Sequence, residues 1–213
     1  MNYWNFFIEN KSEIASLAIE HLWMVGISTL LAVAVGIPLG ILITRKTSFY
    51  KPIIAAANVI QTIPSLALFG FLLPAPWIGE RAGRLAVLAL TLYALLPLIR
   101  NTYTGIKGVD HAVREAATGM GLTEWQLLWK VELPLAANVI LAGVRVAVVI
   151  SVGLATIAAA VGAGGLGELI FRGLAMVNNA VILAGAIPAA LMALLADVLL
   201  GWLEKRLAPA RAA

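Results

Sequence analysis

Long apolar stretches dominate this chain of 213 residues and restrict what it can fold into. A helix needs about twenty consecutive apolar residues to cross the ~30 Å hydrocarbon layer of a bilayer. Five stretches approach or exceed that length, and only 12% of the residues are charged, about half of the ~25% usual in globular proteins. The pattern predicts an all-α polytopic membrane protein. The expected spans are residues 22–44, 53–73, 85–99, 135–162 and 180–203.

Charge and cysteine content exclude several other classes of protein. The net charge of +4 is small, and in a membrane protein the location of charges matters more than their sum, so we expect the lipid bilayer as a partner and no nucleic acid. The chain has no cysteine. A disulfide scaffold, a thiolate metal site and a cysteine nucleophile are therefore excluded.

Lysine and arginine are distributed unevenly across the predicted topology. With the N-terminus outside, the inner side carries ten of the fifteen, the outer side four, and Arg145 lies within the fourth apolar stretch. Because cytoplasmic loops retain positive charge, this bias predicts an external N-terminus and a cytoplasmic C-terminus. The only long polar connection, residues 101–134, is then cytoplasmic.

The first 21 residues differ from the spans. Aromatic residues precede the polar stretch 10–13, a mixture typical of a segment at the membrane surface. We therefore expect an extracytoplasmic interfacial segment at 1–21, a transmembrane domain at 22–203 and a cytoplasmic tail at 204–213.

The cytoplasmic loop has the signals of two short helices. Asp110 is placed to cap the first helix and to pair with Arg114 four residues later. Gly119 and Gly121 predict a left-handed end to that helix. Thr123 and Gln126 have the spacing of a capping box, and the second helix is expected to run until Pro134 turns the chain into the fourth span. Alanines on one face and aromatic residues on the other suit a unit that docks on a partner.

Seven positions of the same loop form a further pattern: Glu115, Ala116, Ala117, Gly121, Val131, Leu133 and Pro134. With Val131 where isoleucine is usual, the pattern resembles the EAA signature of the membrane subunits of ATP-binding-cassette importers. In that family the loop is a coupling helix that sits in a cleft of a separate ATPase subunit. The resemblance implies a type I importer permease with a cytoplasmic ATPase, an extracytoplasmic substrate-binding protein and a second permease copy, identical or closely homologous. It also implies a bacterial-type cytoplasmic (inner) membrane.

Four stretches extend the resemblance: QTIPSLALFGFLLP, LPLIRNTYTGI, REAATGMGLTEWQLLWKVELPLA and VGAGGLGELIFRGL. They are similar to the permeases of osmoprotectant importers for glycine betaine, carnitine or choline. Methionine importer permeases share the size, the EAA loop and a similar glycine-rich stretch, so a methionine or other amino-acid substrate is the alternative. A secondary transporter is a weaker alternative, because neither inverted repeats nor carboxylates at mid-depth are visible.

Polar residues inside the spans are candidates for a translocation path, because polar groups facing lipid are costly. The densest cluster lies mid-way along the second span: Gln61, Thr62, Pro64 and Ser65. Pro64 frees a backbone carbonyl without introducing a charge. Tyr93 belongs to a second cluster with Thr91 and Pro97 and, like Phe69 and Trp23, could offer a ring face to a trimethylammonium group. Two interpretations stay open: these groups line a path, or they satisfy one another.

Other motifs point away from catalysis and cofactors in this chain. Residues 162–167 satisfy G-x-G-x-x-G but follow an apolar helix rather than a strand, so we expect a flexible outer turn and no bound nucleotide. A P-loop is absent, which predicts that this chain is not an ATPase. His21 and His111 fall in different compartments and leave no histidine metal site.

Two further pairs of positions have structural interpretations. Gly36 and Gly40 form a G-x-x-x-G that predicts close helix packing. Arg145 and Asp197 lie near the cytoplasmic boundary of their spans. Either the two side chains form an ion pair, or the Arg145 side chain extends alone to the membrane interface.

Overall fold

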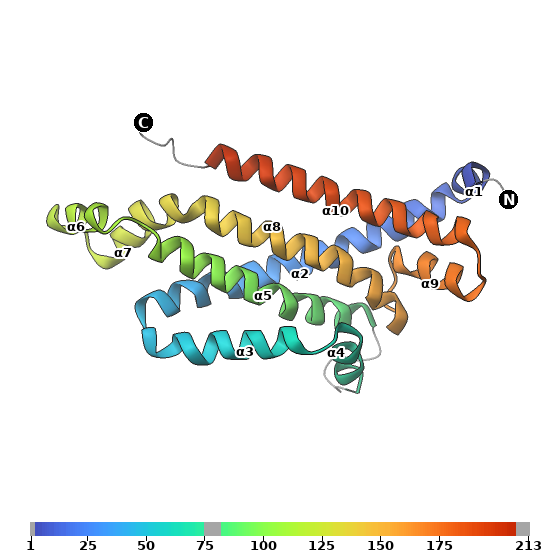
Figure 1. Ribbon diagram of the computed structural model, residues 1–213, viewed down its shortest axis with the longest axis horizontal. Helices are drawn as coiled ribbons and strands as arrows, with labels where there is room; N and C mark the ends of the chain where they lie inside the picture. The colour runs from blue at the N-terminus through green and yellow to red at the C-terminus, as the bar shows by residue number, and fades with distance from the viewer. Residues whose placement is uncertain (1–2, 75–81, 208–213) are drawn as a thin grey trace.

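A computed structural model of the chain describes residues 3–74 and 82–207. In those residues all regular structure is helical, and four long helices run side by side (Figure 1). They are α2 (Lys11–Arg45), α5 (Ala82–Lys107), α8 (Leu133–Ala158) and α10 (Asn179–Leu207). Each is long and apolar enough to cross a membrane, α8 together with its flanking turns, and the bent pair α3 and α4 makes a fifth candidate span. The predicted all-α polytopic fold is confirmed.

The first membrane helix begins earlier than hydrophobicity alone predicts. α1 (Tyr3–Glu9) is separated from α2 by Asn10, whose backbone N–H donates to the Phe6 carbonyl at 3.0 Å. The 35 residues of α2 span about 52 Å at 1.5 Å per residue, well beyond the hydrocarbon layer. The expected boundary after residue 21 therefore falls inside α2. Its polar start does not break the helix, since an acidic residue such as Glu13 in the first turn is favoured by the helix dipole.

Helices α2, α5 and α8 pack together through small residues. A Cβ placed on Gly36 would lie 2.9 Å from the Cβ of Leu98, and one on Gly40 would lie 2.5 Å from the Cβ of Thr102. Both glycines therefore let α2 approach α5 more closely than any side chain would allow. The predicted close packing at this motif is confirmed, and α5 is the helix it packs against.

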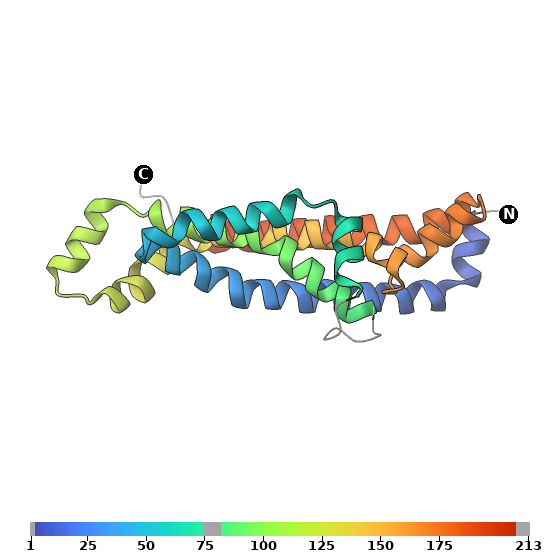
Figure 2. The ribbon, with the colours of Figure 1, turned by 90° about the horizontal axis from the view of Figure 1, so that it is seen from below.

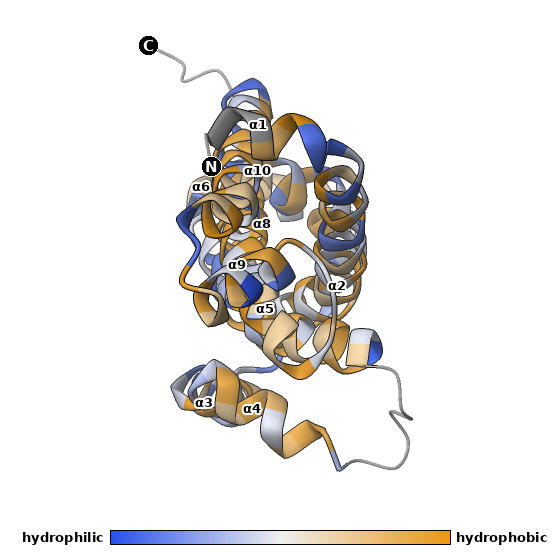
Figure 3. Ribbon diagram, turned by 90° about the vertical axis from the view of Figure 1, so that its right-hand side faces the viewer, coloured by the Kyte–Doolittle hydropathy of each residue, from blue (hydrophilic) through white to orange (hydrophobic). Residues whose placement is uncertain are grey.

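The second expected span, 53–73, is two helices rather than one. After the short turn η1 (Thr47–Phe49), α3 (Tyr50–Thr62) meets α4 (Ser65–Leu72) at a bend of 100°. Pro64 causes the break, because it has no N–H and disfavours the helical conformation at Ile63, which is extended with ψ 126°. The prediction of one continuous span was wrong. The bent pair lies along one side of the bundle (Figures 2 and 3).

The two ends of the bundle carry different connections. α5 continues through residues 101–107, which were expected in the loop, so the loop is shorter than predicted. α6 (His111–Gly119) and α7 (Glu124–Leu127) lie at the same end as the last turns of α10, whereas α1 and α9 (Gly167–Ala175) lie at the other end (Figure 1). The loop and the end of α10 thus share one side, as the predicted topology requires. Which side faces the cytoplasm stays a prediction.

The glycine-rich segment between α8 and α9 is a turn fastened to α2. It follows η3 (Ala159–Val161) and contains Gly162, Gly164 and Gly165, all with positive φ. The Gly165 N–H donates to the Glu20 carboxylate at 3.3 Å. The segment is therefore a turn preceded by helix, as predicted.

Candidate functional site

The loop at the α6 end is a helix, a glycine turn and a second helix. The Asp110 carboxylate caps α6 by accepting from the Ala112 N–H at 2.9 Å. At the other end of α6, Gly121 has φ +84°, its N–H donates to the Thr118 carbonyl at 2.9 Å, and the Leu122 N–H donates to the Ala117 carbonyl at 3.2 Å. These two bonds form a Schellman motif, in which a left-handed residue ends the helix. The glycine-ended first helix is therefore confirmed.

The second helix begins with the predicted capping box. The Thr123 N–H donates to the Gln126 side-chain oxygen at 3.0 Å, and the Gln126 N–H donates to the Thr123 hydroxyl at 3.3 Å. The two bonds satisfy backbone donors at the start of α7 that would otherwise lack partners. Together with the Schellman motif, they fix the angle between α6 and α7 by local hydrogen bonds.

Pro134 does not end the second helix as expected. α7 passes through a π-helical turn, η2 (Leu128–Glu132), directly into α8, and Pro134 lies in the first turn of α8. The Leu133 N–H bonds to the Leu128 carbonyl, five residues back instead of four. Because Pro134 has no N–H to give, a wider turn just before it lets the helix continue without a clash. The loop is therefore joined continuously to a membrane helix.

The EAA positions are divided between the surface and the interior. Glu115 and Ala116 are exposed, and the Glu115 carboxylate lies 3.5 Å from Nδ1 of His111. Ala117 is buried, and Leu133 packs against a buried cluster beneath the loop. Val131 is half-buried and Pro134 is exposed. Some EAA positions are thus buried and others, including Glu115 and Ala116, are open to solvent.

Two tryptophans stand on the open part of α7 and the π-turn. Trp125 is 67% exposed and Trp129 is 54% exposed, and their rings meet edge to face with centroids 5.5 Å apart. Val113 and Met120 on the α6 side are also exposed. Large apolar side chains on an extramembrane tip are typical of a surface that binds another protein.

Arg114 does not pair with Asp110 as predicted. Its guanidinium donates to the Ile106 carbonyl at the end of α5, and its Nε lies 3.5 Å from the Glu132 carboxylate. The Glu132 carboxylate also accepts a bidentate pair of hydrogen bonds from the guanidinium of Arg45, the last residue of α2. Sequence reasoning missed Glu132. A lone acid at the entry to an apolar span was the available signal.

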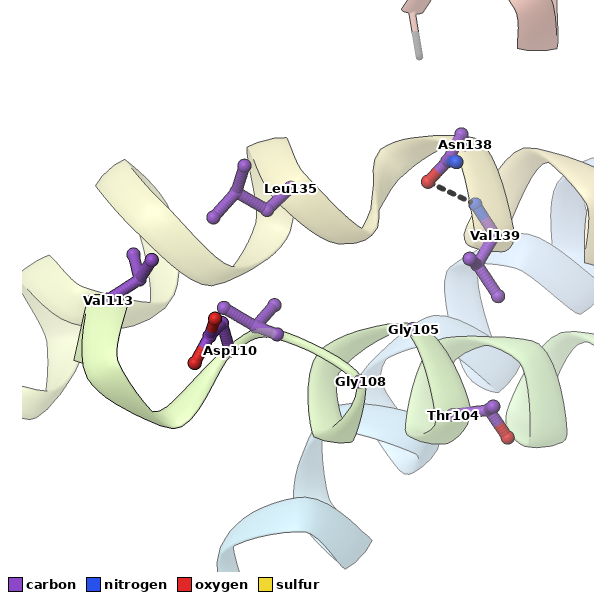
Figure 4. A pocket seen from close by; sticks show the side chains of 9 residues that line it. Thr104, Gly105, Gly108, Asp110, Val113, Leu135, Asn138 and Val139 are labelled. Atoms are coloured by element: carbon purple, nitrogen blue, oxygen red, sulfur yellow. Dashed lines mark hydrogen bonds between the residues drawn. The ribbon is translucent and has the colours of Figure 1, made fainter. Parts of the chain in front are cut away.

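An open hollow of about 490 Å³ lies beside the loop, between the end of α5, the start of α6 and the first turns of α8 (Figure 4). Asp110 and Val113 border it on the α6 side, and Leu135 and Val139 on the α8 side. The Asn138 side chain accepts from the Val139 N–H at 2.9 Å and is therefore turned to its own helix. The start of α6 is thus separated from α8 by open space.

The candidate path residues meet at the break between α3 and α4. The Gln61 amide donates to the Tyr93 carbonyl at 3.0 Å, and the Tyr93 hydroxyl donates to the Ile63 carbonyl. Thr62 and Pro64 are exposed, and the Thr62 hydroxyl bonds back to Val59 at 2.7 Å. Gln61 and Tyr93 thus satisfy polar groups of the break itself.

Ser65 and the three aromatic candidates occupy different surroundings. Ser65 is half-buried in the first turn of α4. Phe69 and Tyr93 belong to one buried cluster, whereas Trp23 is exposed on the outer face of α2. The three rings therefore do not form one cage in this conformation.

The charges in the last two spans form an ion pair. Arg145 donates to Asp197 through two bonds, of 2.6 and 2.8 Å, and its third nitrogen lies 3.5 Å from Glu204. Of the two interpretations of Arg145, pairing is confirmed.

Comparison with known proteins agrees with this architecture. Residues 36–209 match the family described as "binding-protein-dependent transport system inner membrane component". The chain is 46% identical to a carnitine transport permease protein of Listeria monocytogenes, over 97% of this chain and 92% of the relative. It is 47% identical to a glycine betaine/carnitine/choline transport system permease protein of Bacillus subtilis, over 96% of this chain and 88% of the relative.

Solved structures show the same fold at lower identity. A chain of the MetNI methionine ABC transporter, in inward-facing conformations, matches with a TM-score of 0.80 at 24% identity. The match covers 88% of this chain and 93% of the MetNI chain. A chain of an amino acid ABC transporter matches with a TM-score of 0.75 at 22% identity, and the match covers 97% of this chain and 99% of the transporter chain. The match over residues 36–209 agrees with the helical spans and the capped loop, and it shows that this chain belongs to the family of binding-protein-dependent transport system inner membrane components.

Proposed function

We propose that this chain is the membrane-spanning permease subunit of an ATP-binding-cassette importer. The observation that supports this most directly is the α6–α7 unit. Its capped helices place Glu115 and the two exposed tryptophans on one extramembrane tip, while Leu128 of the π-turn packs with Ile106 of α5 and Ala136 of α8 in a buried cluster. A rigid tip joined without a break to α8 is suited to pass the motion of a partner into the membrane.

The partner at this tip is a cytoplasmic ATPase subunit. The sequence contains no P-loop of its own, so hydrolysis belongs to a separate chain and no cofactor is assigned to this one. Glu115 is exposed and able to accept a charge-assisted hydrogen bond, and Trp125 and Trp129 supply exposed apolar area on the same loop. In this topology the N-terminus is outside, and α6, α7 and the C-terminus are cytoplasmic.

The proposed substrate is a small osmoprotectant such as glycine betaine, carnitine or choline. Relatives named for these compounds are 46–47% identical over nearly the whole chain. The alternative is methionine or another amino acid, for which the likeness is one of fold. An extracytoplasmic binding protein delivers the substrate at the α1 and α9 end. A second permease copy, identical or closely homologous, completes the path, because five spans are few to enclose a gated route.

The test is transport by the purified complex. The permease, its ATPase and its binding protein are reconstituted in liposomes, and uptake of labelled glycine betaine, carnitine, choline and methionine is measured with and without ATP. We expect ATP-dependent uptake of at least one quaternary amine. Uptake of methionine alone would support the alternative substrate. A complex that moves none of these, with an active ATPase, would contradict the osmoprotectant assignment.

A further inference from the structure

Glu132 is a buried carboxylate between two arginines from distant parts of the chain. Its side chain is 1% exposed. Arg45, 87 residues earlier, binds both carboxylate oxygens through its two terminal nitrogens. Arg114 approaches the same carboxylate with its Nε 3.5 Å from Oε1, a distance of ion pairing rather than of a formed hydrogen bond. One buried acid therefore holds two cations at once.

The charge balance makes these three groups interdependent. A buried carboxylate is costly unless it is paired and hydrogen-bonded, and removing one partner leaves the other charge uncompensated. The bidentate hydrogen bonding between Arg45 and Glu132 is the strongest geometry of an arginine–carboxylate ion pair. Arg45 remains 32% exposed and can be solvated without its partner, whereas Glu132 cannot. Glu132 is therefore the centre of the cluster.

The three residues also join three structural elements at one place. Arg45 is the last residue of α2, Arg114 lies in α6, and Glu132 is the last residue of the π-turn that leads into α8. Arg114 extends the connection to α5 through the Ile106 carbonyl. Figures 1 and 2 both place the end of α2 next to the α6–α7 loop. Any displacement of α6 thus acts on the ends of two membrane helices through charged contacts.

We propose that Glu132 is a positioning residue that transmits movement of α6 in the α6–α7 loop to the end of α2, to which Arg45 connects it. The inference rests on the proposed function, because it assumes that an ATPase moves the loop. The EAA positions at the surface receive the movement, and the Arg114–Glu132–Arg45 cluster passes it on. The open hollow separates the start of α6 from α8, whereas Arg114 in the same helix reaches Glu132.

The test compares charge-neutral and charge-preserving variants in the complete transporter. Glu132→Gln keeps the shape of the side chain and removes its charge, Glu132→Asp keeps the charge, and Arg45→Gln removes the partner. Arg100→Gln is the matched control, because Arg100 bonds Asn58 at 3.1 Å between α5 and α3 and does not contact the loop. Each complex is assayed for assembly, ATP hydrolysis stimulated by binding protein, and uptake per ATP hydrolysed.

We expect Glu132→Gln and Arg45→Gln each to lower uptake per ATP about tenfold, the size of a typical coupling between sites, with assembly retained. Glu132→Asp should recover most of the loss, and Arg100→Gln should match the parent. The double variant Arg45→Gln/Glu132→Gln should be no worse than either single one, because residues that act as a unit are not additive.

Several results would overturn the proposal. Parental uptake per ATP in Arg45→Gln is one, and additive losses in the double variant are another. If Glu132→Gln reduces the amount of protein in the membrane, Arg45→Gln decides in its place, since Arg45 is partly exposed. Equal loss of assembly in Glu132→Gln, Glu132→Asp and Arg45→Gln would assign the cluster to stability alone. Failure of the proposed function is recognised separately, as absence of ATP-driven uptake by the parental complex.

Discussion

The Tyr93 hydroxyl of α5 donates to the Ile63 carbonyl, which lies where α3 breaks ahead of Pro64. Gln61 completes the connection by donating from α3 to the Tyr93 carbonyl at 3.0 Å. A broken helix inside a membrane leaves backbone groups that lipid cannot satisfy, and here a neighbouring helix supplies the partner. The bend of 100° is thus held by α5 rather than by α3 and α4 alone.

Replacing Tyr93 should weaken this bend. Tyr93→Phe removes the hydroxyl and leaves the Ile63 carbonyl without this donor, at an expected cost of about 1–3 kcal/mol. The midpoint of thermal unfolding in detergent should fall. Tyr103→Phe is the control, because Tyr103 contacts Tyr50 through its ring, at 4.7 Å between centroids. An unchanged midpoint for Tyr93→Phe would show that the bond contributes little.

The path interpretation predicts a transport defect for two substitutions at the break. Gln61→Leu and Ser65→Leu should slow uptake while assembly with the ATPase stays normal, because neutral hydrogen-bonding groups at this depth serve a polar solute. Thr62→Val is the control, since Thr62 bonds within its own helix. Parental uptake by both leucine variants at normal membrane levels would assign the cluster to packing.

A side chain at Gly121 should uncouple transport. A Cβ there would meet nothing within 4 Å, so the cost of Gly121→Val comes from its φ of +84°, about 1–3 kcal/mol of local strain. The angle between α6 and α7 should change and move the tryptophans from their partner. We expect uptake to fall at least about tenfold with insertion retained.

Gly119→Ala provides the matched control for Gly121→Val. It also has open space around its Cβ, but it lies inside α6 and lacks a positive φ. Co-purification with the ATPase, stimulated ATP hydrolysis and uptake are measured for both variants. Normal hydrolysis and uptake by Gly121→Val would refute the coupling role of the loop.

The predicted topology can be tested by thiol labelling, because the native chain has no cysteine. Ser48→Cys and Thr123→Cys should be protected from an impermeant reagent added to intact cells, whereas Ala82→Cys should react. Ser48 and Thr123 are exposed and Ala82 is half-buried. Permeabilised cells provide the control for reactivity. External labelling of Thr123→Cys would reverse the assigned orientation.

The local features of this protein follow from its sequence. Apolar runs determine the lipid environment, and the caps at Asp110, Gly121 and Thr123 depend on hydrogen bonds that reach only a few residues along the chain. Such signals are complete within the segment that contains them. That is why the glycine end of α6 and the capping box of α7 were found as predicted, whereas the partner of Arg114 and the continuation through Pro134 were not.

The tertiary structure decided the rest. The break ahead of Pro64 is bonded to Tyr93, 30 residues from the carbonyl it binds, and the buried Glu132 is paired with Arg45, 87 residues away. No periodicity links such positions, because their meeting depends on how α2, α5 and α8 pack. Helix propensity and hydrophobicity are properties of a single segment. The interaction energy between buried charges, in contrast, arises only after the segments that carry them have packed together.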